Sequence, residues 1–250
     1  MLSYYGKLSS AFYDLDKYIG KSFGDVEYYE NRLKDVRGKV LEPAVGNGRV
    51  LIPLLEKGID ISGFDLSDDM LAFCRAHLEE RKLKADVSKM DMSTFELDEQ
   101  FEAIILPAGS FLLLHDREQS ISALKCFYRH LEAGGRLIID LDLPGDFQTG
   151  SIFKRLIKCG ENESITIEGT LVNVDFVNQV KYSHHKYEKW KNDKLVDTEL
   201  EVFPLRWYGV EEMVLILKQI GFKEVVISAD YEYGTYPVSA NQVITYEATK

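Results

Sequence analysis

The sequence predicts an α/β protein in which a mostly parallel sheet carries helices on both faces and a small antiparallel β insertion follows. Runs of apolar residues at 101–106 and 136–141 indicate strands buried on both faces, and amphipathic helical patterns lie between such runs. A glycine-bearing turn joins the first buried strand to a helix. Period-two alternation between residues 165 and 203 indicates antiparallel strands beyond the parallel sheet.

The length and composition fit one large domain or a domain with an insertion. The chain has 250 residues, of which 45% are hydrophobic and 28% are charged. A chain of this size buries roughly 70 to 75% of its unfolded surface, so its core needs no disulfide or metal. We expect a helical cap over residues 1–36, a main domain over 37–143 and 205–250, and a β insertion over 144–204.

Charge and cysteine content exclude several classes of partner. Thirty basic and 41 acidic residues give a net charge of −11, which repels nucleic acid and anionic membranes. Three widely spaced cysteines without a CxxC pair indicate neither a disulfide framework nor a zinc site, and we expect no metal. No signal-peptide h-region opens the chain, and the run 103–114 is too short to span a bilayer. We expect a cytoplasmic monomer or homodimer.

The first 36 residues mix aromatic and charged side chains, which predicts helices that dock aromatic faces on a larger body. The aromatic residues are Tyr4, Tyr5, Phe12, Tyr13, Tyr18, Phe23, Tyr28 and Tyr29. After Gly38 the extended run 39–44 leads into the turn V-G-N-G, and apolar residues from Val50 follow at helical spacing. This segment is predicted to be strand, tight turn and helix.

The glycine turn differs from a dinucleotide-binding turn in two ways: its third glycine is missing, and an acid precedes it. Gly46 and Gly48 are present, but Leu51 stands at the third glycine position of the dinucleotide fingerprint. Glu42 lies at the end of the strand just before the turn. A carboxylate there suits a ligand with a positively charged head rather than a pyrophosphate.

Two further acids follow the next predicted strands. Asp65 ends the run 59–65, 23 residues after Glu42, and can accept two hydrogen bonds from a ribose diol. Asp91 follows the weak strand 84–88 and could accept from an adenine amine. The alternative, loop acids without a ligand, stays open for Asp91. Ser67 is a predicted N-cap of the helix that separates the two strands.

The remaining elements complete the predicted order. A helix over 117–131 is closed by Gly134-Gly135 and precedes the strand 136–141. Asn192-Asp193-Lys194 is a hairpin-turn candidate within the insertion. The chain ends with a helix over 210–220, closed by Gly221, and with strands over 222–228 and 242–248.

Four segments resemble the motifs of class I S-adenosylmethionine-dependent methyltransferases. They are LEPAVGNGR (motif I, acid-x-x-x-G-x-G), GFDLSDDML (motif II), MDM (the acidic adenine-binding motif) and IILPAGSFLL (the motif IV strand and loop). The resemblance covers about residues 36–142 and the closing helix and strands. It implies a Rossmann-like seven-stranded sheet with an antiparallel closing hairpin, and S-adenosylmethionine as cofactor.

The resemblance also implies roles at the methionine end of the cofactor. Glu42 would face its ammonium group and the Leu106 carbonyl would contact the same group. Gly46 and Gly48 would admit the methionine moiety, and Tyr13 would reach its carboxylate.

At the adenosine end, the resemblance assigns four residues. Asp65 would hold the ribose hydroxyls and Leu66 would pack on the adenine ring. Asp91 and the Met92 amide would read the adenine edge.

The Phe12-Tyr13-Asp14 core and the β insertion look like those of small-molecule methyltransferases, including sugar-amine and glycine/sarcosine enzymes. In those enzymes the helical cap covers the cofactor and the insertion covers the acceptor. The loop after Leu106, P-A-G-S, lacks the Asp/Asn-Pro-Pro-aromatic pattern and the cysteine nucleophile of enzymes that methylate DNA bases. We therefore expect a small-molecule acceptor and no nucleic acid.

Methyl transfer from a sulfonium is an in-line displacement that needs positioning in a dry pocket, so no catalytic residue is predicted. A hydroxyl acceptor would need a general base and an amine would not, which leaves N or O transfer open. Candidate acceptor contacts are His115, Trp207, Tyr208 and one of His184 and His185, which face opposite ways on a strand.

Two alternative functions share this fold. One is a module that binds the cofactor without transferring methyl groups. The other is a nicotinamide-dependent dehydrogenase, which is disfavoured by Leu51 and by the lack of a Tyr-x-x-x-Lys signature.

Overall fold

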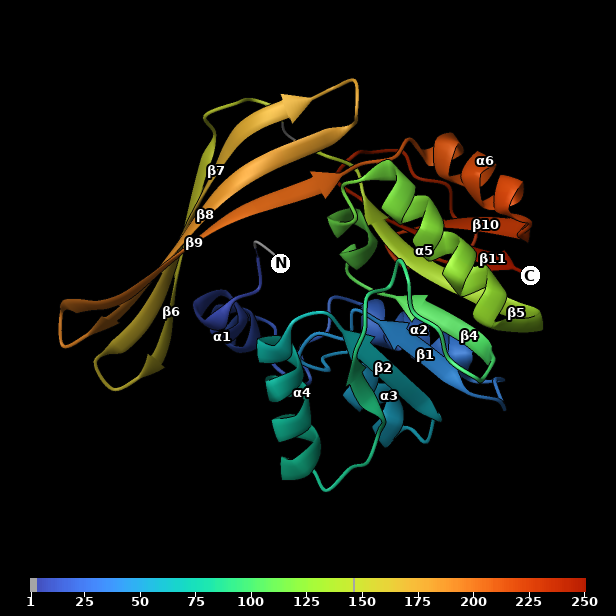
Figure 1. Ribbon diagram of the computed structural model, residues 1–250, viewed down its shortest axis with the longest axis horizontal. Coiled ribbons are helices and arrows are strands. Elements are labelled where there is room, and N and C mark those ends of the chain that lie inside the picture. The colour runs from blue at the N-terminus through green and yellow to red at the C-terminus, as the bar shows by residue number, and fades with distance from the viewer. Residues whose placement is uncertain (1–3, 146) are drawn as a thin grey trace.

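The computed structural model describes residues 4–145 and 147–250 and contains two sheets (Figure 1). The larger sheet has seven strands in the order β10-β11-β5-β4-β1-β2-β3. Its strands are β1 (Val40–Pro43), β2 (Ile61–Asp65), β3 (Val87–Lys89), β4 (Phe101–Leu106), β5 (Leu131–Asp142), β10 (Lys223–Ala229) and β11 (Val243–Thr249). Strands β1 to β5 are parallel, whereas β11 runs antiparallel to both β5 and β10. The predicted α/β class and the closing hairpin are confirmed.

Helices cover both faces of this sheet, and the core therefore divides into two clusters. The helices are α1 (Lys7–Asp16), α2 (Asp25–Leu33), α3 (Leu51–Glu56), α4 (Asp68–Glu80), the 3-10 helix η1 (Ser110–Leu113), α5 (Arg117–His130) and α6 (Val210–Ile220). In β4, Ile104 and Leu106 pack with α5 and α6, while Ala103 and Ile105 pack with α2, α3 and α4. Alternate residues thus enter opposite clusters, as a strand buried on both faces requires.

The second sheet is an antiparallel meander in the order β6-β7-β8-β9. Its strands are β6 (Ile152–Gly160), β7 (Glu163–Asp175), β8 (Val180–Lys191) and β9 (Lys194–Arg206). Asn192 and Asp193 form the predicted turn between β8 and β9, with φ of 49° and 59°. Strand β6 was not predicted, because most of this edge strand is exposed and its sequence, IFKRLIKCG, does not alternate with period two.

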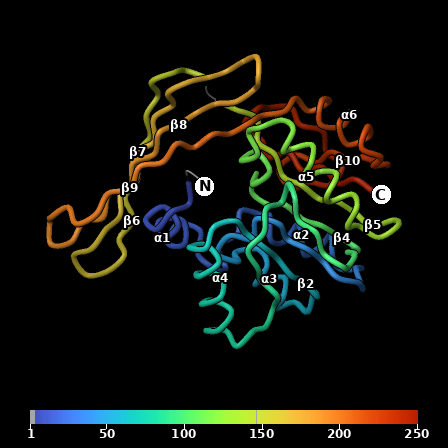
Figure 2. The backbone as a smooth tube through the Cα atoms, viewed as in Figure 1, coloured from blue at the N-terminus to red at the C-terminus, as the bar shows by residue number. Residues whose placement is uncertain are grey.

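Helix α1 lies between the meander and α4 (Figures 1 and 2). Leu8 and Phe12 pack against Ile165, Ile167 and Tyr187 of the meander. The carboxylate of Glu199, on β9, accepts hydrogen bonds from the backbone amides of Leu8 and Ser9 at 2.9 and 3.0 Å. A strand side chain thereby satisfies amides that have no partner within the first turn of a helix.

One predicted boundary is wrong. Helix α5 ends at His130 and β5 begins directly at Leu131, so Gly134-Gly135 does not close the helix but lies within β5. A Cβ at Gly135 would lie 3.1 Å from the carbonyl oxygens of Phe101 and Glu102. The pair's second glycine is therefore required by the close approach of β5 to β4. Over the described ranges, no helix has the length and apolar character needed to cross a bilayer.

Candidate cofactor site

A cavity of about 290 Å³ opens at the carboxyl ends of β1, β2 and β3. Six of the predicted cofactor residues line it: Tyr13, Gly46, Asp65, Leu66, Asp91 and Met92. Parallel strands bring their carboxyl ends to one edge of the sheet, which explains why residues far apart in sequence share this cavity. Over the described chain, no group of His, Cys, Asp or Glu side chains is arranged to hold a metal ion.

Asp65 links the tip of β2 to the glycine turn. Its Oδ2 accepts a hydrogen bond from the Gly46 amide at 2.9 Å, and its Oδ1 accepts one from the Ser67 amide at 2.8 Å. Burial raises the pKa of this carboxyl, while the backbone amides oppose that rise. An ionised carboxylate offers about four lone-pair sites, so two remain for hydroxyl groups of a ligand. The Ser67 hydroxyl accepts from the Met70 amide at 3.2 Å and caps α4 as predicted.

The two glycines of the turn serve different purposes. Both have positive φ, 58° at Gly46 and 86° at Gly48. A Cβ at Gly46 would meet only the Met70 methyl group, 3.7 Å away. A Cβ at Gly48 would come within 3.0 Å of the Cys74 sulfur and of Ile52. Gly46 therefore leaves the cavity open, whereas Gly48 lies outside its lining and allows the turn to pack on α4.

Two other predicted residues lie outside the cavity lining. Leu106 is fully buried at the end of β4. Glu42 is 3% exposed, and its Oε2 has no hydrogen-bond partner in the part of the chain that the structure describes. Burial raises the pKa of Glu42 well above its usual value, although the charge of Arg49 opposes this. A buried, unsatisfied carboxylate at this strand tip fits the ammonium group of an amino-acid ligand.

Asp91 and the N-terminal segment close the other end of the cavity. Asp91 Oδ1 accepts from the Ser93 amide at 2.8 Å and from the Ser93 hydroxyl at 2.7 Å. Tyr4 and Tyr5 also line the cavity, and the Ser67 hydroxyl donates to the Tyr5 carbonyl at 2.9 Å. Burial, with the charges of Asp91 and Asp65, raises the pKa of Tyr4 to about 12. Tyr4 and Tyr5 were not predicted to line a site, since their position depends on how the segment before α1 docks.

Polar contacts hold the cap segment on the glycine turn. Asn47 Nδ2 donates to Asp14 Oδ1 and to the Lys17 carbonyl, both at 2.9 Å. Asp14 Oδ1 also lies 2.7 Å from His77 Nε2 of α4. Arg49 forms a buried ion pair with Asp25, in which Nη1 lies 3.1 Å from Oδ1. The cap and the turn thus form one polar unit behind the cavity.

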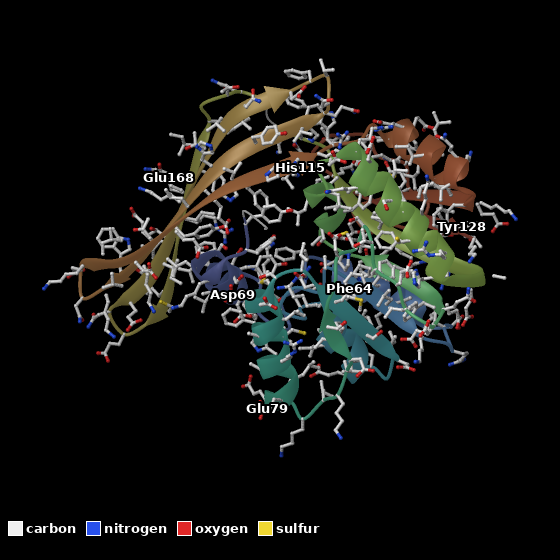
Figure 3. The ribbon with its side chains drawn as sticks, in the orientation of Figure 1. Phe64, Asp69, Glu79, His115, Tyr128 and Glu168 are labelled. Carbon is white, nitrogen blue, oxygen red and sulfur yellow. The ribbon has the colours of Figure 1, made fainter. Side chains whose placement is uncertain are left out.

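The residues predicted to contact the acceptor lie in different environments in the structure. His115 lines the cavity, and its ring packs edge-on against Tyr182 of β8 with centroids 6.3 Å apart. Figure 3 shows His115 where the chain entering α5 approaches the meander. Trp207 instead packs against Phe147 and Phe176, and neither it nor Tyr208 lines the cavity.

Tyr208 is 3% exposed and belongs to the core beside Phe111. The two adjacent histidines of β8 face opposite ways, as predicted: His185 is buried and stacks on Phe203 with centroids 4.7 Å apart, whereas His184 is exposed. The inner face of the meander is therefore the face that carries His185 and Phe203.

Asp140 supports the loop that follows β4. It is 1% exposed, and its Oδ2 accepts from the Ala108 amide and the Tyr231 hydroxyl, both at 3.1 Å. Its Oδ1 accepts from the Thr245 hydroxyl at 2.7 Å. Burial raises the pKa of Asp140 to about 6, although these donors oppose the rise. Ala108, with φ of 56°, is thereby held in a conformation that non-glycine residues seldom adopt.

Asp140 is expected to make stability fall as the pH rises. Between pH 4 and 6 the folded state keeps a proton that the unfolded state releases, so the unfolding free energy decreases through this window. The shift corresponds to about 3 kcal/mol. Denaturant unfolding of the wild type and of Asp140→Asn from pH 4 to 7 measures this term, because other groups cancel in the difference. A difference that stays constant with pH would contradict it.

Parallel strand tips that bring a glycine turn, Asp65 and Asp91 around one cavity are the arrangement in which open α/β domains bind their ligands. Residues 40–135 match the model of a methyltransferase domain family. This match and the methyltransferase relatives of the chain support a class I S-adenosylmethionine-dependent methyltransferase, for which S-adenosylmethionine is the cofactor.

Individual relatives agree with this assignment. The chain is 25% identical over 215 residues to the putative methyltransferase YqeM of Bacillus subtilis, covering 86% of this chain and 85% of that protein. It is 27% identical over 227 residues to a glycine/sarcosine N-methyltransferase of Aphanothece halophytica, covering 88% and 79%. The solved sugar N-methyltransferase KedS8 from Streptoalloteichus shares the fold, with a TM-score of 0.76, 24% identity and coverage of 100% and 97%.

Proposed function

We propose that the protein transfers a methyl group from S-adenosylmethionine to a nitrogen or oxygen of a small molecule. The observation that carries the proposal is the single cavity in which Gly46, Asp65 and Asp91 meet from three strand tips and which extends to His115. An adenosyl ligand and an acceptor can therefore meet at one site. When bound, the cofactor supplies an electrophilic methyl group on a sulfonium.

In this proposal, the residues of the chain bind and orient. The two remaining lone pairs of Asp65 accept the ribose hydroxyls, and Asp91 accepts from the adenine amine. Leu66 packs on the adenine ring and the Met92 amide donates to its edge. The Glu42 carboxylate holds the ammonium end, a role that its unpartnered Oε2 supports.

The other assigned residues act through their backbone or, for Tyr13, through a long side chain. Gly46 lets the methionine moiety approach the turn, and Gly48 supports that turn from behind. The Leu106 carbonyl faces the ammonium group from the end of β4. Tyr13 lines the cavity and reaches the cofactor carboxylate. These contacts exclude water and fix the methyl group for in-line attack.

The three parts of the chain have separate tasks in this account. Residues 37–143 and 205–250 bind the cofactor. Residues 1–36 act as a cap, which the cavity contacts of Tyr4, Tyr5 and Tyr13 support. Residues 144–204 cover the acceptor, which is supported by the packing of Tyr182 against His115. No residue is assigned as an acid or base, and a cytoplasmic location stays a prediction from the cysteine content.

Two measurements test the proposal. Calorimetry should detect binding of S-adenosylhomocysteine and none of NAD, and binding of NAD alone would contradict the assigned cofactor. Incubation with S-adenosylmethionine labelled on its methyl group should then transfer the label to members of a pool of amines and phenols. Binding of the cofactor without transfer to any acceptor would favour a binding module instead of an enzyme.

A further inference from the structure

The segment that precedes α1 forms part of a wall between the cofactor cavity and a second hollow. Tyr4 and Tyr5 line the cavity on one side and, on the other, a groove of about 720 Å³ that β9 also lines. Leu66 and Asp91 complete this wall, and they lie just beyond the ends of β2 and β3. The sheet fixes those two residues, so displacement of the tyrosine segment alone would join the cavity to the groove.

Strand β9 holds this segment with three alternate residues, whose side chains point to the same face of the strand. The carboxylate of Glu199 accepts hydrogen bonds from the first amides of α1. The carboxylate of Glu201 accepts one from the Gly6 amide at 3.3 Å. The ring of Phe203 packs edge-on against the rings of both tyrosines, with centroids 5.6 and 6.0 Å apart. The insertion therefore contacts the wall of the cofactor cavity directly.

The backbone of the segment is held in a strained conformation between β9 and α4. Tyr5 has a φ of 56°, which residues other than glycine seldom adopt. On the α4 side, the Ser67 hydroxyl donates to the Tyr5 carbonyl at 2.9 Å. On the β9 side, a Cβ at Gly6 would lie 3.0 Å from the carboxylate oxygens of Glu199. Such strain persists only while contacts on both sides maintain it, so loss of the β9 contacts would favour a different position of the segment.

Given the proposed function, we infer that residues 4–6 are a gate for exchange of the cofactor and that Glu199 is the positioning residue that holds this gate shut. Glu199 lies in the groove, outside the lining of the cofactor cavity, and acts through the segment that it binds. Its hydrogen bonds join protein groups only, so they are the same in the free and the bound protein. Weakening them should therefore speed entry and exit of the ligand by the same factor and leave its affinity unchanged.

Binding kinetics of S-adenosylhomocysteine to the full-length protein test this inference. Surface plasmon resonance on the immobilised protein gives the association and dissociation rate constants. Glu199→Ala is expected to raise both by about tenfold, which corresponds to the loss of one charge-assisted hydrogen bond from the closed state. The dissociation constant should stay within about twofold of the wild-type value. Glu199→Gln keeps one acceptor oxygen and should raise both rate constants by a smaller factor.

A neighbouring acid on the same strand provides the control. Asp197 is exposed, and its Oδ1 accepts from the amide of the next residue, Thr198, at 2.9 Å. Asp197→Ala removes the same charge from β9 without touching the gate, so both rate constants should equal those of the wild type. Urea unfolding shows whether each variant is folded under the binding conditions. If Glu199→Ala is not folded, Glu199→Gln is judged by the same two rate constants.

Two results would overturn the gate while the proposed function stands. The first is a folded Glu199 variant whose association and dissociation rate constants both equal those of the wild type. The second is faster dissociation without faster association, because Glu199 would then shape the bound site instead of controlling access to it. A wild type that does not bind S-adenosylhomocysteine at all would contradict the proposed function itself.

Discussion

Asp65→Ala is expected to weaken S-adenosylhomocysteine binding by about ten- to a hundredfold, or about 1.5 to 3 kcal/mol. The variant loses the acceptor proposed for both ribose hydroxyls. It also leaves the amides of Gly46 and Ser67 without the carboxylate that now accepts from them. The glycine turn then loses its link to β2, so the loss should lie toward the upper end of the range. Isothermal calorimetry measures it.

A nearby acid provides the control for this variant. Asp69 lies in the first turn of α4 and is exposed, so Asp69→Ala removes the same charge without touching the cavity. Its affinity for S-adenosylhomocysteine should equal that of the wild type. Denaturant unfolding of Asp65→Ala shows whether the protein remains folded under the binding conditions. Unchanged affinity in a folded Asp65→Ala would refute the ribose assignment.

Arg49→Met is expected to lower the free energy of unfolding by about 3 to 5 kcal/mol, because it leaves the buried charge of Asp25 without a partner. The side chains of Arg49 and Asp25 are 4% and 1% exposed. Although burial opposes ionisation, the bond from Arg49 holds the pKa of Asp25 below its usual value. Without Arg49, Asp25 must protonate or leave its site, and the cap then loosens from the glycine turn. Urea unfolding at pH 7 gives the change.

A second substitution shows whether the stability loss of Arg49→Met comes from an unpaired buried charge or from lost packing. Adding Asp25→Asn to Arg49→Met removes the remaining charge and should restore part of the lost stability. The exposed pair of Lys39 and Glu99 serves as the comparison, and Lys39→Met should leave the unfolding midpoint unchanged. If Arg49→Met behaves like Lys39→Met, the cap is not held by this ion pair.

Elements whose ends are set by local chemistry could be predicted from the sequence. Ser67 caps α4 through its own side chain, and Gly221, with φ of 125°, ends α6. The strand and turn around Gly46 follow from an apolar run and glycines with positive φ. By contrast, β6 is an exposed edge strand, so its apolar and polar residues need not alternate. Gly135 is required by the close approach of β4, which its local sequence does not show.

In the site, too, residues placed by local sequence could be predicted and residues placed by distant contacts could not. The positions of Asp65 and Asp91 at the cavity could be predicted because the ends of their strands can be recognised in the sequence. The ion pair between Arg49 and Asp25 could not, since the two residues are 24 positions apart and meet only when α2 docks. Gly48 occupies the second glycine position of the motif but packs on α4. The spacing of the glycines alone does not distinguish this packing role from contact with a ligand.

A crystal structure of the protein with S-adenosylhomocysteine tests the convergence of the strand tips most directly. We expect both ribose hydroxyls within hydrogen-bond distance of Asp65, the adenine amine at Asp91 and the amino group toward Glu42. An adenosyl group bound elsewhere, or bound with Asp65 facing away from the ribose, would contradict the account.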